Sequence, residues 1–522
     1  MKFYDVPLRE RNLILDFAEV DVSLKTESGF EIFDEDILEA SFESVHEKTG
    51  GIVNSGLVVL DNTKGRYGLF ADSSLKAGLK IEVWFRLKKT GFSLKRFVFY
   101  ADSDGFAAEA EEDKRKCRIK LRDFSYRLKR SNYYNDWSSN ANAVHCAVCD
   151  AGKAEKSLVH ILASRGGVDL LKVAGCALDY EVLYVTFSMS VWDELSLLAK
   201  AYRAHLECTA ENELEFIESR YSKDELNAKK NIGKTVLDNI YESENLWELG
   251  ADELSKVCVK DNGDAYWNTV RIRQTRYSST EKIRLWKYSD EPVFFDEDFV
   301  AQYLFGTYKR AIQIDENYVA PFYVFDKDGK ILDVVYTEDV DTLEEFEERI
   351  VCTGDVWAIV YDTETYKDRA IVQLYVPNEC VLTKCEIWGR AIVALDNWAH
   401  YINDGAGVLK NGTVAHNVSN KYLSESLLEG EPFYNVWAND ELENGLKHFV
   451  SVEGVTNTAL FAARVGSKLA VNTDGILIKQ NGKSYQCGRL EVKLERLVLK
   501  YAKNRAFESA FCGIAEIKED YD

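Results

Sequence analysis

The stretch Leu79-Lys-Ile-Glu-Val-Trp-Phe-Arg-Leu87 largely alternates apolar and polar side chains, which is the period of a β-strand with one buried face. Upstream, Gly56-Leu-Val-Val-Leu60 is followed by Asp61-Asn-Thr-Lys-Gly65, a turn cluster in which Gly supplies the positive φ. Strands of the same style are predicted at Lys95–Tyr100 and Cys117–Asp123. Short strands separated by turn signals predict a small antiparallel barrel or sandwich over residues 1–150. We expect the acidic segment 102–116 to form an exposed hairpin loop.

The hydrophobic period then changes to that of helices. Residues 155–165 place Leu158, Ile161 and Leu162 on one helical face, and Gly166-Gly167 supplies a stop signal. Ser190-Val-Trp-Asp193 has the spacing of a capping box and predicts the start of a second helix. Alternation at Leu214 and Phe216 predicts a strand. We therefore expect a small α+β domain at 151–222.

Strand patterns return after this unit, at 267–274, 281–286, 356–361, 370–375 and 385–389. They predict a second β-barrel domain with insertions at 223–410, interrupted by a short helix capped by Thr342. A helix after Asn439, with Leu442, Leu446 and Phe449 facing inward, and a strand-rich tail predict a C-terminal α+β domain at 411–522. The predicted fold class is mainly β with α+β insertions: two tube-like antiparallel β-barrels plus two peripheral α+β domains.

Composition narrows the class of protein. The chain has 522 residues, 46% of them hydrophobic, which is enough for packed cores and excludes a disordered or fibrous chain. Only 5 residues are proline, so no Pro-rich linker separates the domains. A net charge of −22 opposes non-specific binding to nucleic acids. The 11 scattered cysteines fit free thiols made in a reducing cytoplasm rather than a disulfide framework.

The first residues, MKFYDVPLRERNLILDF, lack the apolar run and the cleavage site of a signal peptide, and we expect none. The most apolar region, Leu170–Trp192, is interrupted by Lys172, Asp179 and Glu181. We therefore expect no membrane segment.

The cluster closest to a metal site is His145-Cys-Ala-Val-Cys149. A tetrahedral zinc site needs four ligands, and the sequence has no second CxxC, although Cys176 and His160 could complete the set in space. Three interpretations stay open for Cys146 and Cys149: small buried side chains, zinc ligands or a redox pair. Our prediction is no required metal and no cofactor.

Other chemistry-bearing patterns are weak. Gly233-Lys-Thr235 resembles the end of a phosphate-binding loop, but Ala228 stands where the first Gly is needed. The seven His residues are dispersed, and neither HExxH nor G-x-S-x-G is present. Asp362 and Glu364 near Trp357 could suit a glycosidase, yet a solvated β-turn is the simpler interpretation. We therefore predict that the chain is not an enzyme and assign no catalytic, cofactor-binding or metal residues.

Two groups of motifs carry a resemblance to a known family. In the first domain these are Leu57-Val-Val-Leu-Asp-Asn-Thr-Lys-Gly-Arg-Tyr67, Leu75-Lys-Ala-Gly-Leu-Lys-Ile-Glu-Val83 and Arg96-Phe-Val-Phe-Tyr-Ala-Asp-Ser103. Their order resembles the N-terminal barrel of the tail hub (baseplate hub) proteins of long-tailed bacteriophages and related injection machines. Ala77, Phe99 and Ala101 depart from that family's usual Pro, Gly and Ile.

The second group continues the same order. Ser157–Ala163, Val191-Trp-Asp-Glu-Leu-Ser-Leu-Leu-Ala199 and Leu214–Phe216 with Arg220 resemble the second domain of the hub, and Tyr266–Ile272 resembles the start of its second barrel. The resemblance covers about residues 50–300.

The resemblance implies a homotrimer whose barrels form a ring that joins a sixfold tail tube to a threefold tip and lets DNA pass without binding it specifically. It implies a place at the tail tip of a virion or phage-like particle, after assembly in the bacterial cytoplasm. The partners implied are the tail tube or distal tail protein, the tape measure protein, and tip or fibre proteins. Two alternatives stay open: a tail-associated carbohydrate- or peptidoglycan-acting enzyme, and a receptor-binding module.

Overall fold

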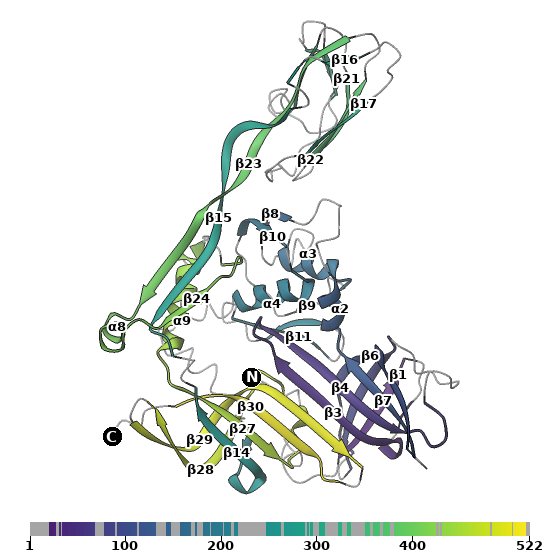
Figure 1. The fold of residues 1–522 in the computed structure, drawn as a ribbon, viewed down its shortest axis with the longest axis vertical. Helices are drawn as coiled ribbons and strands as arrows, with labels where there is room; N and C mark the ends of the chain where they lie inside the picture. Colours follow the sequence, from purple (N-terminus) through teal and green to yellow (C-terminus); the bar gives the residue numbers. More distant parts are fainter. Residues whose placement is uncertain are drawn as a thin grey trace.

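The computed structural model shows a mainly β protein (Figure 1). It describes residues 20–27, 31–32, 34–67, 78–88, 91–111, 114–131, 142–147, 157–168, 173–174, 181–187, 189–201, 203–209, 213–217, 247–262, 266–287, 290–291, 293–295, 302–307, 322–325, 331–335, 350–354, 359–365, 369–375, 380–423, 427–428, 431–480, 483–503 and 505–517.

The N-terminal half of the main sheet forms where the sequence alternates. Along β5, for example, buried Ile81, Val83 and Phe85 alternate with less buried polar neighbours. A burial period of two is what a strand with one core face requires. The elements of this half are β1 (Val20–Thr26), β2 (Glu31–Ile32), η1 (Asp34–Asp36), β3 (Ile37–His46), β4 (Gly51–Asp61), β5 (Lys80–Leu87), β6 (Ser93–Glu111) and β7 (Lys114–Arg122). The four strands predicted here are therefore confirmed.

The C-terminal half of the main sheet comes from two distant parts of the chain. Residues 247–261 contribute the first strands, and residues 449–516 contribute the rest. In chain order the elements are β13 (Trp247–Leu249), η5 (Ala251–Glu253), β14 (Leu254–Asp261), β27 (Phe449–Thr456), η7 (Leu460–Ala462), β28 (Lys468–Gln480), β29 (Lys483–Ala502) and β30 (Glu508–Glu516).

The two halves are one sheet. β29 pairs with β3 in antiparallel register, from Arg496 opposite Val45 to Ala502 opposite Glu39. The described strands form an open path in the order β14-β27-β30-β29-β3-β4-β7-β6-β5-β1-β2. The number of barrels thus stays a prediction. β14 pairs with β27, so strands from both sides of residue 410 lie in this sheet, and the domain bounds stay a prediction.

A single core lies under both halves. Phe85 of β5 stacks on Phe461 of η7, with ring centroids 5.3 Å apart, and meets Phe507 edge-on at 6.0 Å. Phe85 also contacts Phe42 of β3 at 5.7 Å. Each such aromatic pair contributes about 0.5–1.5 kcal/mol beyond the buried area. The halves are therefore joined by packing as well as by the strand ladder.

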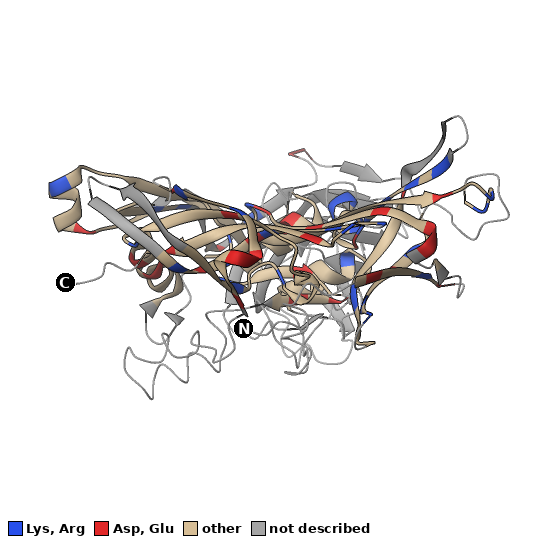
Figure 2. Ribbon diagram, turned by 90° about the horizontal axis from the view of Figure 1, so that it is seen from below, with Lys and Arg blue, Asp and Glu red and all other residues tan. Residues whose placement is uncertain are grey.

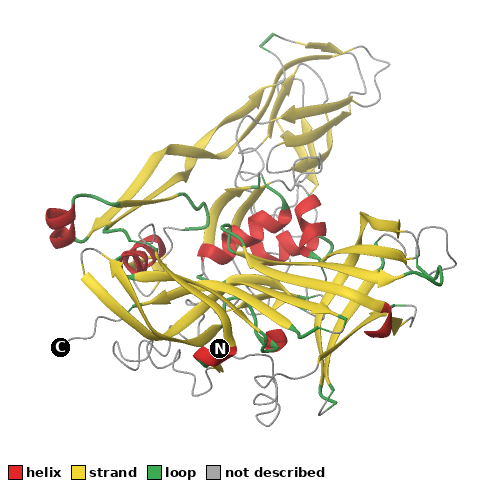
Figure 3. Ribbon diagram, turned by 60° about the horizontal axis from the view of Figure 1, so that its bottom comes forward, coloured by secondary structure: helices red, strands yellow, loops and turns green. Residues whose placement is uncertain are grey.

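A helical unit lies against the N-terminal half (Figure 3). Its attachment is β11, which pairs in parallel with β4. Gly51 of β4 is needed here, since a Cβ at this position would lie 2.5 Å from the Trp192 ring of α4. The elements are α2 (Ser125–Arg130), β8 (Asn142–Ala147), α3 (Leu158–Arg165), β9 (Val173–Ala174), β10 (Glu181–Thr186), α4 (Val191–Ala201), β11 (His205–Cys208) and β12 (Leu214–Ile217).

Both helices predicted in this unit are confirmed. Ser190 caps α4, because its Oγ accepts a hydrogen bond from the Asp193 amide at 3.2 Å. Trp192, Leu195 and Ala199 lie at helical spacing along α4, and all three are buried. After α3, Gly167 has φ +74°, the left-handed conformation expected of a helix stop.

An arm leaves the main body as a long hairpin of β15 and β23 (Figure 1). Segments 267–274 and 281–286, predicted as separate strands, belong to the single strand β15. The elements of the arm and its base are β15 (Thr269–Lys287), β16 (Val293–Phe295), β17 (Gln302–Thr307), β18 (Phe322–Phe325), β19 (Ile331–Val335), β20 (Ile350–Gly354), β21 (Ile359–Thr365), β22 (Arg369–Tyr375), β23 (Cys380–Asn403), α8 (Gly405–Asn411), β24 (Ala415–Val418), β25 (Leu427–Leu428), β26 (Glu431–Pro432) and α9 (Phe433–Gly445).

Two other sequence predictions are corrected. Segment 102–116 is largely strand rather than loop. After a register shift between Ala101 and Phe106, β6 and β7 are paired out to Glu111 opposite Lys114. Helix α9 begins at Phe433 rather than after Asn439, and it buries Phe433 and Trp437, while Leu446 is exposed. The helix predicted at Thr342 lies outside the described residues.

Candidate functional site

The residues considered for a metal site are only partly placed. His145 and Cys146 lie on β8, where Cys146 is opposite Val182 of β10. His160 is buried in α3, which packs beside β8, and burial lowers the pKa of its imidazole. Cys149 and Cys176 lie outside the described residues. Within the described ranges, no group of three or more His, Cys, Asp or Glu side chains is placed to hold a metal ion.

The other sequence candidates do not form a described site either. Gly233–Thr235 and Trp357 lie outside the described residues. Asp362 and Glu364 were interpreted as part of a β-turn, which is wrong: both lie within strand β21, and Asp362 is opposite Gln373 of β22. Both strands continue past these positions.

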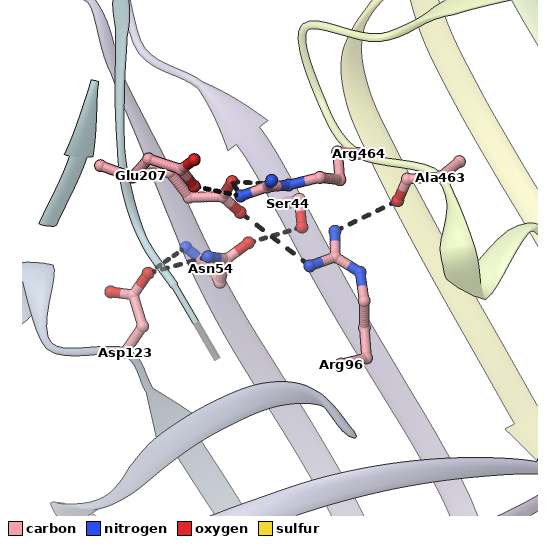
Figure 4. A network of polar contacts seen from close by, with 8 residues as sticks. Ser44, Asn54, Arg96, Asp123, Glu207, Ala463 and Arg464 are labelled. Carbon is pink, nitrogen blue, oxygen red and sulfur yellow. Dashed lines mark hydrogen bonds and ion pairs between the residues drawn. The ribbon is translucent and has the colours of Figure 1, made fainter. Parts of the chain in front are cut away.

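The structure instead brings together a buried charged cluster that sequence analysis missed. We call it the polar junction: Ser44, Asn54, Arg96, Asp123, Glu207 and Arg464 (Figure 4), with the partly exposed Glu215 at its edge. Arg96 reaches the interior because β6 carries a β-bulge at this position, between the pairs formed by Lys95 and Phe97. Its side chain is 1% exposed.

Glu207 of β11 is the centre of the polar junction. One of its carboxylate oxygens accepts hydrogen bonds from Nε and Nη2 of Arg464, at 3.2 and 2.7 Å. The other oxygen lies 3.9 Å from Nη1 of Arg96. Arg464 also reaches Glu215 of β12 at 3.1 Å, and Arg96 donates to the Ala463 carbonyl oxygen at 3.2 Å. The helical unit, the N-terminal half and the C-terminal half therefore meet at one carboxylate.

A second part of the polar junction surrounds Asp123, which follows β7. One carboxylate oxygen accepts from the amide and the side-chain nitrogen of Asn54, at 2.7 and 3.1 Å. The other accepts from the amide of Ser125 at 3.1 Å and from its hydroxyl group. Asn54 in turn accepts from Ser44 at 2.5 Å. Burial raises the pKa of Asp123 to about 6, although these hydrogen bonds act in the opposite direction.

Two histidines, His46 at the end of β3 and His205 at the start of β11, are in contact. Nδ1 of His205 is 2.8 Å from Nε2 of His46, and the rings meet edge-on. Burial, together with the nearby cation of Lys493, lowers the pKa of both imidazoles, that of His46 to about 4. The pair is therefore uncharged near neutral pH, which lets one ring donate to the other.

The helical unit is also tied to the base of the arm. Glu194 of α4 is fully buried and accepts from Lys421 at 2.7 Å and from the Tyr422 hydroxyl at 2.5 Å. At the end of α4, Arg203 forms an ion pair with Glu441 of α9 and stacks over the Trp437 ring at 4.4 Å. Buried ion pairs cost desolvation energy, and their best-attested benefit is a unique arrangement.

Three buried carboxylates join parts of the chain that are distant in sequence. Glu207, Glu194 and Glu441 are each engaged by a cation from a different part of the chain. All three side chains are buried. None of the helices in the described ranges is long and apolar enough to cross a membrane.

Among known proteins, only solved structures are similar to this chain, and the similarity is one of fold. No family model matches the sequence, and no curated protein is similar to it in sequence. Among solved structures, the 43 kDa tail protein of prophage MuSo2 from Shewanella oneidensis is 9% identical with a TM-score of 0.45, over 96% of this chain and 98% of that one. A tail protein from Neisseria meningitidis MC58 is 8% identical with a TM-score of 0.43, over 96% and 97%.

A third similar structure is the E. coli c3393 protein, a component of the type VI secretion system that exhibits structural similarity to the T4 bacteriophage tail proteins gp27 and gp5. It is 11% identical with a TM-score of 0.34, over 93% of this chain and 75% of that one. These structures are tail and secretion-system proteins, the class that the order of motifs in the sequence resembles.

Proposed function

We propose that this chain is a structural hub protein of a phage-like tail. The observation that carries the proposal is the continuous sheet in which β29 pairs with β3. This pairing joins two halves of the chain into one body. The charged groups where the halves meet form ion pairs with one another. The motifs that resemble hub proteins lie on successive elements of this body: β4, β5 and β6, then α3, α4 and β12.

The finer proposal concerns assembly. Three copies form a ring that joins the sixfold tail tube to the threefold tip. The ring contacts the tail tube or distal tail protein on one side, and tip or fibre proteins on the other. The tape measure protein and then DNA pass through its centre. The support for this proposal is the order of the hub-like motifs in the sequence.

The charge of the chain supports the passage of DNA. With a net charge of −22, copies arranged in a ring can present more acidic than basic groups to the channel. Each cation facing DNA would add a salt-dependent phosphate contact and slow its movement. An acidic wall keeps the DNA hydrated and central, provided that the wall lies within about 8–10 Å, where salt does not yet screen it.

Imaging the assembled protein tests this function. We expect a threefold ring with an open channel and an acidic wall. Particles carrying Lys in place of Asp or Glu on that wall should eject DNA more slowly. A basic wall, or ejection unaffected by these changes, would leave the net charge as a solubility feature. Without a ring of any kind, the hub function itself would be wrong.

The proposal includes the absence of catalysis. A tail-associated glycosidase would use two carboxylates in a cleft, one with a raised pKa. Asp123 has a raised pKa, but it is buried and its oxygens accept hydrogen bonds from Asn54 and Ser125. We therefore propose that Asp123 has a structural role and not a catalytic one.

A further inference from the structure

Two imidazole rings are in contact where three parts of the chain meet. His46 ends β3, and His205 begins β11, the strand that attaches the helical unit to β4. Nδ1 of His205 lies 2.8 Å from Nε2 of His46, and both side chains are partly buried. Gly466, which precedes β28, lies against the His205 ring, since a Cβ at Gly466 would be 3.4 Å from Cδ2 of the ring. The histidine pair is therefore surrounded by the N-terminal half, the helical unit and the C-terminal half.

The strand ladder beside the histidine pair is short. The parallel pairing of β11 with β4 has two register pairs, Leu206 opposite Gly51 and Glu207 opposite Ile52. His205 directly precedes the first of them. A ladder of this length opens locally at a low cost in free energy unless side-chain contacts at its end support it. The contact between the two rings is such a support.

The contact between the rings depends on their protonation. A neutral imidazole has one N–H donor and one acceptor nitrogen, so one ring can donate to the other. One added proton can be shared, because an imidazolium N–H donates to a neutral imidazole. A second proton turns both facing nitrogens into N–H groups, and neither can then accept from the other. Two protonated rings must therefore separate.

Two cations on neighbouring elements act on the histidine pair. Burial, followed by Lys493 of β29 and Lys200 of α4, lowers the pKa of His46. Burial, Lys493 and the charge of a protonated His46 lower the pKa of His205. Basic and acidic residues are interspersed over the described sheet (Figure 2), so the groups nearest to the rings dominate the field there. Protonation of both rings would place two more positive charges beside these cations.

The carboxylate next to the pair is already engaged. Against the effect of burial, the charge of Glu47 raises the pKa of the neighbouring His46. One oxygen of Glu47 accepts from Lys129 of α2 at 2.6 Å, and the other accepts from Nε1 of Trp192 in α4 at 3.1 Å. Both contacts connect the end of β3 to the helical unit. Glu47 therefore cannot turn toward a protonated His46 without losing one of them.

We propose that the contact between His46 and His205 is an acid-sensitive latch that holds the helical unit on the sheet. In the closed form, one ring donates to the other and β11 stays paired with β4. Protonation of both rings separates them, and β11 leaves β4 together with the helical unit. The core shared by the two halves of the sheet contains neither histidine and stays packed. The inference goes beyond the proposed hub function and does not depend on it.

The opening of the latch has a pH dependence of fixed sign. The closed form holds His46 with a pKa of about 4, whereas the ring released into water has its ordinary value of 6.5. The open form therefore binds more protons between these values, and acid favours it. For one ring the opening equilibrium increases by at most about tenfold for each pH unit, since one pKa unit is about 1.36 kcal/mol.

Hydrogen exchange of the full chain, measured by mass spectrometry, tests the latch. Exchange is followed at about pH 6.5 and about pH 4 and is corrected for the intrinsic effect of pH on amide exchange. Peptides from β11 and α4 report on the helical unit, and peptides from β1 and β5 report on the sheet. We expect the amides of β11 and α4 to exchange at least about tenfold faster at the lower pH, while those of β1 and β5 change little.

Three variants separate the latch from other effects of acid. His46→Gln keeps a side chain that donates and accepts but cannot become a cation, so β11 should lose most of its acid response. His160→Gln is the matched control, because His160 is buried in α3 of the same unit and burial lowers the pKa of its imidazole too. This control should open as the wild type does. Lys493→Gln leaves both rings in place and removes a cation that opposes their protonation in the closed form, so its acid response should be smaller.

Several results would overturn the inference. An acid response of β11 that persists in full in both His46→Gln and Lys493→Gln would assign the opening to other groups, such as the carboxylates of the polar junction. Loss of the response in His160→Gln would move the switch to α3. Exchange of β11 that is equal at the two pH values in the wild type, or acceleration that is equally large in β1 and β5, would show that acid does not release the helical unit. None of these results bears on the hub function, which is tested by assembly.

Discussion

At the scale of single residues, Glu207 holds two guanidinium groups that come from different halves of the sheet. Replacing it with Gln leaves Arg464 and Arg96 without their shared counter-charge in a buried position. We expect a loss of about 3–5 kcal/mol in the free energy of unfolding, because an uncompensated buried charge is costly. Glu215→Gln is the matched control, since Glu215 is 35% exposed and its ion pair should contribute at most about 1 kcal/mol. Equal melting temperatures for the two variants would contradict this account.

Asp123 and His46 should give opposite pH dependences. The pKa of Asp123 is raised to about 6 in the fold, so the folded state binds more protons than the unfolded state above about pH 4, and stability falls as pH rises toward 6. The pKa of His46 is lowered to about 4, so its contribution increases as pH rises from about 4 to 6.5. Each slope reaches at most about 1.4 kcal/mol per pH unit. Unfolding curves of Asp123→Asn and His46→Gln between these pH values, compared with the wild type, should change slope in opposite directions. Changes of the same sign would show that the burial of one group is misassigned.

Cys146 and Cys149 give a third prediction at this scale. A structural zinc ion would need four ligands, and the sequence supplies one CxxC. Elemental analysis of the purified protein should therefore find no stoichiometric zinc. Zinc that disappears when both residues are changed to Ser would prove the prediction wrong.

At the scale of elements, the pairing of β29 with β3 joins the two halves of the sheet. Val498→Pro removes an amide from the part of β29 that pairs with β3 and should destabilise the protein by about 3 kcal/mol or more. Ser255→Pro is the control, because Ser255 lies at a bulge of β14, an end strand of the described sheet path. Limited proteolysis should release fragments from the first variant and leave the second intact. Equal resistance would mean that the core alone holds the halves together.

Helices and strands could be predicted where apolar residues recur with the period of a strand or a helix. The alternation in β5 and the capping box at the start of α4 depend on neighbouring residues only, and both were predicted. The start of α9 was missed, although Phe433 and Trp437 have helical spacing. The polar junction gave no local signal, because Arg96 faces inward only through a bulge and Glu207 is neutralised by Arg464, 257 residues away. Contacts between distant segments decide such sites, and a single sequence does not display them.

At the scale of the whole molecule, the proposed hub function requires that three copies of the chain assemble into a ring. The pairing of β29 with β3 and the ion pairs where the two halves meet join distant parts of the chain into one body. The arm of β15 and β23 extends from this body (Figure 1), and the body below it contains the single core shared by both halves.

The mass of the purified chain in solution tests the central claim most directly. One copy has a mass of 59.5 kDa. Light scattering at about 50 mM salt, where surface charges are little screened, should give three times this value. A mass that stays at 59.5 kDa at every protein concentration would contradict the hub account.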